Sequence, residues 1–214
     1  MQAETCRLYL ITPPRIEVAG FAEALARALD AGDVACVQLR LKEVSDDDIR
    51  RAAKALLAVT ATRDVALIMN DRPDLARETG CDGVHVGQQD APYEAARQVV
   101  GADAVVGVTC HGSRDLAIEA AAKGADYVAF GAFYATATKE AKARANLDTL
   151  AWWSEMTTVP SVAIGGITPT NCPPLVRTGA DFLAVVTAVW DHPDSPAAAV
   201  KAFESAIAEL PEGG

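Results

Sequence analysis

Eight short strand-like runs alternate with amphipathic segments along this chain. The runs are rich in β-branched and other apolar residues and comprise residues 8–11, 34–37, 65–68, 83–86, 104–108, 127–130, 161–164 and 182–186. The segments between them have the hydrophobic period of helices, for example at residues 21–29, 49–59, 116–122 and 197–210. The 214 residues leave about 27 for each repeat, so we expect parallel strands joined by right-handed helical crossovers.

Helix boundaries support this segmentation. Ser45 precedes three aspartates, Asp46 to Asp48, which is typical of an N-cap followed by an acidic first turn. Where helices should end, a glycine is followed by an aspartate and then a strand. We expect each of these glycines to adopt the left-handed conformation after the last helical turn: Gly32, Gly80, Gly101, Gly124 and Gly179.

Two architectures fit eight parallel strands, a closed (β/α)8 barrel and an open doubly wound sheet. An open sheet of this size usually carries a G-x-G-x-x-G turn after its first strand. Here that turn is Thr12-Pro13-Pro14-Arg15. No linker rich in proline or serine divides the chain, so we predict a single α/β domain over residues 1–214, a (β/α)8 TIM barrel.

The charge balance limits the partners that the chain can bind. Its 19 lysines and arginines against 29 acidic residues give a net charge of −10 at pH 7. A nucleic-acid backbone needs a broad basic face and is therefore excluded as the main partner, whereas a few local cations can still hold a small phosphate. The longest apolar run, residues 182–186, is too short to cross a membrane. Residues 1–4 lack the basic start of a secretory signal, so we expect a cytoplasmic protein; a homo-oligomer is left open.

The five cysteines are scattered and form no C-x-x-C pair. This spacing argues against a disulfide framework and against a structural zinc site. Cys36 and Cys110 lie in strand-like sequence, where we expect them to be small buried side chains without a catalytic role.

In a (β/α)8 barrel the active site forms at the carboxyl ends of the strands, so polar residues at those ends are informative. At the end of the second run, Gln38, Arg40 and Lys42 alternate with two leucines. A strand period of two puts the three polar side chains on one face, where the two cations would make an anion site. The alternative is a frayed strand whose cations are merely solvated.

Two carboxylates follow neighbouring strands. Asp71 comes directly after Asn70 at the end of the third run, and Asp90 follows the fourth. Carboxylates so placed can share a hard cation, and Mg²⁺ typically takes only one or two of them. The alternatives are an N-cap for a helix starting near Pro92 and an ordinary turn residue at Asp71.

Further candidates lie at the remaining strand ends. Thr109 offers a hydroxyl, and His111 is either a base or structural; His85 lies inside its strand, where we expect packing or support of a neighbour. The long connection after the sixth run carries Thr136, Thr138 and Lys139, which suit a phosphate-gripping lid or an incidental surface loop.

The last two strands end in residues that suit a phosphate cup. Gly165 and Gly166 let main-chain N–H groups approach a ligand, and Val186 and Thr187 end the eighth run. The loops after strands 7 and 8 are the recurrent phosphate site of this fold. With the cationic, metal-binding site across strands 2 to 4, the sequence predicts that two anionic substrates meet in one mouth.

This constellation resembles the thiamine phosphate synthase family over nearly the whole chain. The segments that carry the resemblance are Gln38-x-Arg40-x-Lys42, Asn70-Asp71, His85-Val86-Gly87-Gln88-x-Asp90, Thr136-x-Thr138-Lys139, Ile164-Gly165-Gly166-Ile167 and Val186-Thr187. The resemblance implies a transferase of thiamine biosynthesis that joins hydroxymethylpyrimidine diphosphate to a thiazole phosphate and releases pyrophosphate with Mg²⁺.

The resemblance also implies roles for individual residues. The pyrimidine diphosphate would be held by Gln38, Arg40, Lys42, Asn70 and Lys139, and Thr109 would be a further substrate-binding residue. The thiazole phosphate would be held by Thr136, Thr138, Gly166, Val186 and Thr187, and Mg²⁺ by Asp71 and Asp90. Catalysis would fall to Arg40, Lys42, Lys139 and Thr109, which act on the developing charges without a protein nucleophile.

The chain departs from the family pattern at several positions. Thr109 stands for a usual serine, Ala132 and Ala135 for prolines, Leu41 for an acidic residue and Pro13 for an aspartate. A related thiazole tautomerase shares the barrel and phosphate cup but generally lacks the paired aspartates. A diverged paralogue of this kind, or a protein that binds thiazole or thiamine phosphate without turnover, is the alternative.

Overall fold

The computed structural model describes residues 6–135 and 145–209. In this part of the chain, eight parallel strands pair in sequence order and β8 pairs with β1, which closes the barrel. The strands are β1 Arg7–Ile11, β2 Val34–Leu39, β3 Ala66–Asn70, β4 Gly83–Val86, β5 Val105–His111, β6 Tyr127–Gly131, β7 Ser161–Ile164 and β8 Phe182–Val185. The predicted (β/α)8 barrel is confirmed.

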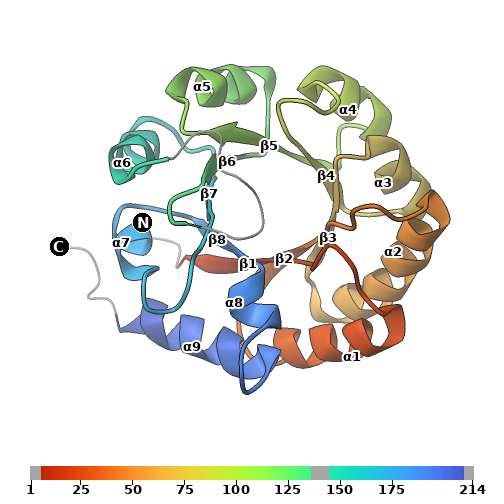
Figure 1. Ribbon diagram of the computed structural model, residues 1–214. Coiled ribbons are helices and arrows are strands. Elements are labelled where there is room, and N and C mark those ends of the chain that lie inside the picture. The colour runs from red at the N-terminus through yellow and green to blue at the C-terminus, as the bar shows by residue number, and fades with distance from the viewer. Residues whose placement is uncertain (1–5, 136–144, 210–214) are drawn as a thin grey trace.

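Helices form a ring around this barrel (Figure 1). They are α1 Val18–Leu29, α2 Asp46–Thr60, α3 Pro73–Thr79, α4 Tyr93–Val100, α5 Arg114–Lys123, α6 Leu147–Met156, α7 Pro173–Arg177, α8 Thr187–Trp190 and α9 Pro196–Ala208, with a 3-10 turn at Ala61–Arg63. Two helices, α8 and α9, follow β8, whereas the sequence pattern indicated only the second. None of the helices in the described part is long and apolar enough to cross a membrane.

Strand alternation divides the core into two layers. Leu8 and Leu10 of β1 pack outward against the helices, in the larger cluster of buried apolar residues. Tyr9 and Ile11 of the same strand point into the barrel, where they meet a smaller cluster that includes Tyr127. Successive residues of a strand face opposite sides, so the barrel interior is a packed floor beneath the mouth.

The second strand ends earlier than predicted. β2 stops at Leu39, so Arg40 and Lys42 lie in the loop after the strand and do not continue its alternation. The reason is local: the backbone N–H of Arg40 donates to Thr12 Oγ1 at 2.9 Å and that of Lys42 to the Pro14 carbonyl at 2.9 Å. These bonds to the loop after β1 replace the strand ladder.

The segments in which a glycine and then an aspartate precede a strand, here called tags, differ in the conformation of their glycines. Gly80, Gly124 and Gly179 have positive φ angles, and the first two cap their helices in the left-handed conformation. The expectation is wrong for Gly101, whose φ of 93° is combined with an extended ψ of 178°, and for Gly32, which is not among the glycines with positive φ.

The aspartates of three tags hold the strands together at the amino end of the barrel. Asp82 accepts from the backbone N–H of Leu67, Asp126 from Val106 and Asp181 from Ser161, each at 2.7 Å. Each carboxylate thus binds the start of the preceding strand. The tag therefore stabilises the end of the barrel opposite the predicted site.

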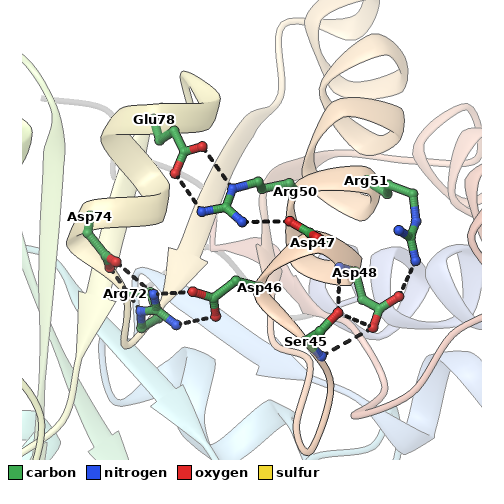
Figure 2. Close-up of polar contacts among 9 residues, drawn as sticks. All are labelled: Ser45, Asp46, Asp47, Asp48, Arg50, Arg51, Arg72, Asp74 and Glu78. Carbon is green, nitrogen blue, oxygen red and sulfur yellow. Dashed lines mark hydrogen bonds and ion pairs between the residues drawn. The ribbon is translucent and has the colours of Figure 1, made fainter.

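The start of α2 is capped as predicted. Ser45 accepts from the Asp48 backbone N–H, and the Asp48 carboxylate accepts from the Ser45 backbone N–H. Figure 2 shows how this helix is tied to α3: Arg50 bridges Asp47 and Glu78. A capping box satisfies two donors that the helix itself leaves unpaired.

All five cysteines are free, and four of them are buried. Burial raises the pKa of the Cys110 thiol to about 12. A thiol of this kind is protonated at neutral pH and is a poor nucleophile.

Candidate active site

A cavity of about 450 Å³ opens at the carboxyl ends of the strands. Every predicted site residue that the structure describes lines it: Gln38, Arg40, Lys42, Asn70, Asp71, Asp90, Thr109, Gly166, Val186 and Thr187. Thr136, Thr138 and Lys139 lie outside the described residues. The barrel thus brings together side chains from strands far apart in the sequence, whereas their individual roles stay predictions.

The two cations of the β2–α2 loop differ in their surroundings. Lys42 Nζ forms an ion pair with Asp71 Oδ2 at 2.6 Å. Within residues 6–135 and 145–209, no side chain forms an ion pair or a hydrogen bond with the Arg40 guanidinium. Arg40 is therefore available for an anionic ligand.

Asp71 is held in place by its backbone and by the residue that follows it. Its φ of 63° lies in the left-handed region, which aspartate tolerates better than most residues. Its N–H donates to the His85 carbonyl at 2.8 Å. Arg72 turns outward and forms paired bonds with Asp46 at 2.7 and 2.9 Å and with Asp74 at 2.9 and 2.6 Å (Figure 2). These bonds fix the start of α3 and leave the Asp71 carboxylate in the mouth.

Asp71 and Asp90 form a hydrogen-bonded pair of carboxyl groups. Burial alone raises the pKa of Asp71, but hydrogen bonds with Lys42 and Asp90 outweigh it and hold that pKa below its usual value. Burial raises the pKa of Asp90, and its hydrogen bond with Asp71 raises it further, against a bond from the Gly87 N–H at 2.8 Å. Without a bound cation, Asp90 therefore takes up a proton at a higher pH than Asp71 does.

Asp90 is not a helix cap. The N-cap position of α4 is Pro92, which leaves the Asp90 carboxylate facing the cavity. Among the described residues, no three His, Cys, Asp or Glu side chains form a metal cluster. Two carboxylates in a cavity open to solvent and substrate nevertheless fit Mg²⁺, which completes its coordination with water and phosphate oxygens.

Thr109 is anchored to the barrel floor. Its hydroxyl lies 2.7 Å from His85 Nε2, and His85 Nδ1 lies 2.9 Å from the Tyr127 hydroxyl. His85 is 8% exposed. It therefore supports a site residue, as expected for an inward-facing strand position.

A second set of hydrogen bonds anchors the side-chain amides of Gln38 and Asn70, on the side of the cavity away from Thr109. Tyr9 donates to Gln38 Oε1 at 3.1 Å, and Gln38 Nε2 donates to Asn70 Oδ1 at 2.7 Å. The hydroxyls of Tyr9 and Tyr127 lie 2.9 Å apart. Sequence reasoning missed both tyrosines. Gly107 could have indicated one of them. A glycine inside a strand indicates that a neighbouring group approaches closely, and Gly107 pairs with Tyr127 across β5 and β6.

The opposite side of the cavity is built from main chain. Gly165 and Gly166 have φ angles of 107° and 63°, which few other residues adopt. The short helix α8 begins at Thr187, directly after β8. His111, with a φ of 53°, also lines the cavity, and its role stays open.

The structure is a closed (β/α)8 barrel, and its cavity is lined by cations, paired carboxylates and glycine turns. These features define the class of barrels that hold phosphorylated small molecules. The sequence profile of the thiamine monophosphate synthase family matches residues 8–189. The chain belongs to this family.

Relatives and a solved structure agree with this assignment. The chain is 63% identical over 198 residues to the thiamine-phosphate synthase of Rhodospirillum centenum, covering 92% of this chain and 96% of that one. It is 47% identical over 209 residues to the thiamine-phosphate synthase of Hyphomonas neptunium, covering 95% of each. The thiamine phosphate pyrophosphorylase structure from Pyrococcus furiosus has a TM-score of 0.84 at 29% identity, covering 97% of this chain and 98% of that one.

Proposed function

We propose that this chain is a Mg²⁺-dependent transferase that joins hydroxymethylpyrimidine diphosphate to thiazole phosphate and forms thiamine phosphate. The observation that carries the proposal is one cavity with Arg40 and Lys42 beside Asp71 on one side and Gly165–Gly166 on the other. Such a cavity suits two anionic substrates. The relatives in Rhodospirillum centenum and Hyphomonas neptunium are named thiamine-phosphate synthase, which supports the same reaction.

Asp71 and Asp90 would hold the Mg²⁺ ion. When bound, Mg²⁺ neutralises charge on the diphosphate and on the departing pyrophosphate. Lys42 already contacts Asp71 at 2.6 Å, so its ammonium lies beside the proposed metal and diphosphate. Arg40, whose guanidinium pairs with no side chain in residues 6–135 and 145–209, would add a second cation, and Lys139 is assigned to the same diphosphate.

The remaining residues bind and orient the two rings. Gln38, Asn70 and Thr109 would hold the pyrimidine, while Thr136, Thr138, Gly166, Val186 and Thr187 would hold the thiazole phosphate. The bond between the pyrimidine methylene carbon and the diphosphate oxygen breaks, and pyrophosphate leaves with the electron pair. The thiazole nitrogen then bonds to that carbon. Because Arg40 and Lys42 stabilise the leaving charge, no protein nucleophile is required.

The test is to mix both substrates with Mg²⁺ and measure thiamine phosphate and pyrophosphate together. Equal amounts of both products are expected. Binding of the phosphate ligands with no product, under conditions where a control synthase is active, would contradict the proposal and favour a non-catalytic binder. Conversion of the thiazole alone would favour the tautomerase alternative. The cytoplasmic setting and a homo-oligomer stay predictions.

An Arg40→Ala variant is expected to raise the KM for the pyrimidine diphosphate about tenfold to hundredfold. Hydrogen bonds to charged groups contribute about 1.5–3 kcal/mol, and Arg40 has no described protein partner that would be left unpaired. Steady-state kinetics at saturating thiazole phosphate measures the change. Arg15→Ala is the matched control, because Arg15 pairs with Glu43 at 2.6 Å and does not line the cavity. Equal effects of both changes would place the diphosphate elsewhere.

A further inference from the structure

A continuous line of hydrogen bonds crosses the barrel floor beneath the cavity. It links two sides of the mouth through six side chains, in the order Thr109, His85, Tyr127, Tyr9, Gln38 and Asn70. The successive distances are 2.7, 2.9, 2.9, 3.1 and 2.7 Å. Both ends of the line reach the cavity, and its middle is buried.

The line has a direction because each tyrosine hydroxyl has one proton. Tyr9 donates its proton to Gln38 Oε1, so it can only accept from Tyr127. Tyr127 has then used its own proton, and its oxygen accepts from His85 Nδ1. Burial raises the pKa of both tyrosines well above the usual value, which keeps each hydroxyl protonated.

The two ends of the line therefore face a ligand with opposite character. When the His85 imidazole is neutral and its proton is on Nδ1, Nε2 accepts; Thr109 then donates its proton to His85 and offers lone pairs to the cavity. At the other end, Asn70 Oδ1 accepts from Gln38. Asn70 can therefore offer a ligand only an amide N–H, and its side chain also hydrogen-bonds the Asp71 carboxylate.

We propose that Tyr9, Tyr127 and His85 are positioning residues that fix this pattern, with Thr109 accepting and Asn70 donating. The pattern selects a heterocycle that offers an N–H donor to Thr109 and an acceptor to Asn70. An amino-substituted pyrimidine meets both demands, whereas its oxo counterpart presents an acceptor to an acceptor. The choice of a pyrimidine as the ligand rests on the proposed function; the direction of the line does not.

The barrel is shaped to seat the central tyrosine. A Cβ atom at Gly107 would lie 1.9 Å from the Tyr127 ring, so only glycine leaves room for the ring on β5. Tyr127 also stacks on His85, with ring centroids 5.6 Å apart, and meets Tyr9 edge-on at 5.9 Å. These contacts hold the ring in place when its hydroxyl is removed. Tyr127→Phe is therefore the variant of choice.

The first test measures the His85 tautomer by ¹⁵N NMR without substrate. The sequence has only three histidines, so His111→Gln and His192→Gln variants assign the signals. We expect a protonated Nδ1 and an unprotonated Nε2 at neutral pH. In Tyr127→Phe the proton should move to Nε2, toward Thr109. Tyr93→Phe is the matched control, because that hydroxyl donates to the Gly124 carbonyl outside the barrel. A wild-type proton on Nε2, or no change in Tyr127→Phe, would overturn the inference.

The second test compares an amino-pyrimidine phosphate with its oxo analogue as competing ligands. The wild type should prefer the amino form about 10- to 100-fold, because the oxo form would leave buried polar groups of the site unpaired. Tyr127→Phe should lose most of this preference, and Tyr93→Phe should keep it. An unchanged preference in Tyr127→Phe would overturn the inference. A wild type that binds neither ligand would contradict the proposed function, while the NMR result would still decide the direction of the line.

Discussion

Asp71→Asn is expected to lower kcat/KM for thiamine phosphate formation at least about hundredfold. The substitution removes one of two proposed Mg²⁺ ligands, and loss of metal assistance worth about 3 kcal/mol in the transition state gives a loss of this size. Asn is close in size to Asp and keeps an acceptor oxygen, so the fold should be retained. Calorimetric titration with Mg²⁺ in the presence of pyrophosphate should show the same loss of affinity without turnover.

Two companion variants separate the metal from the nearby ion pair. Asp90→Asn leaves the Lys42–Asp71 pair at 2.6 Å in place, so a comparable loss in both variants assigns the effect to Mg²⁺. A loss confined to Asp71→Asn would assign it to Lys42. Asp74→Asn is the matched control three residues along the chain, where the carboxylate turns away onto Arg72 (Figure 2). Full activity of Asp71→Asn would contradict the metal assignment.

The barrel could be predicted because its repeat is local. Each unit shows an apolar run, a helical segment and a glycine-aspartate tag, and parallel strands with right-handed crossovers leave few arrangements. The helix α8 was missed because its four residues, Thr187–Trp190, are too few to show a helical period. The direction of the tag aspartates, such as Asp82 toward Leu67, depends on pairing between strands that no local pattern reveals.

The predicted site residues that the structure describes line one cavity, even though the local argument for two of them was wrong. Arg40 and Lys42 were assigned to a strand face, but bonds to Thr12 and Pro14 end β2 at Leu39. Their place in the mouth depends on the fold, in which every strand ends on the same side. The loop alone does not reveal that Lys42 would pair with Asp71 and leave Arg40 available.

The barrel floor could not be predicted because its members come from different strands. Tyr9 and Tyr127 are 118 residues apart, and each is typical of a buried strand. Only closure of the barrel places their hydroxyls 2.9 Å apart. A hydrogen-bond line of this kind is set by tertiary geometry, whereas polar residues at strand ends can be recognised from the chain alone.

The second large effect is expected from a substitution in the turn after β7. Gly165→Ala is expected to lower stability by about 2–5 kcal/mol, of which about 1–2 comes from a side chain at positive φ and about 1–3 from overpacking. The φ is 107°, and the new Cβ would lie 2.3 Å from Ala132 Cβ. Thermal unfolding should show a Tm about 4–20 °C lower.

Gly80→Ala isolates the overpacking from the backbone strain. Gly80 also has a positive φ, 75°, but a Cβ atom there would meet nothing within 4 Å, so only the strain of about 1–2 kcal/mol applies. The kinetic consequence should also be specific to Gly165. Its carbonyl accepts from the Tyr134 N–H at 3.0 Å, so moving Ala132 away displaces the loop after β6 from the glycine turn. The KM for thiazole phosphate should therefore rise more than that for the pyrimidine diphosphate. Equal losses of stability in the two alanine variants would show that the contact with Ala132 relaxes without cost.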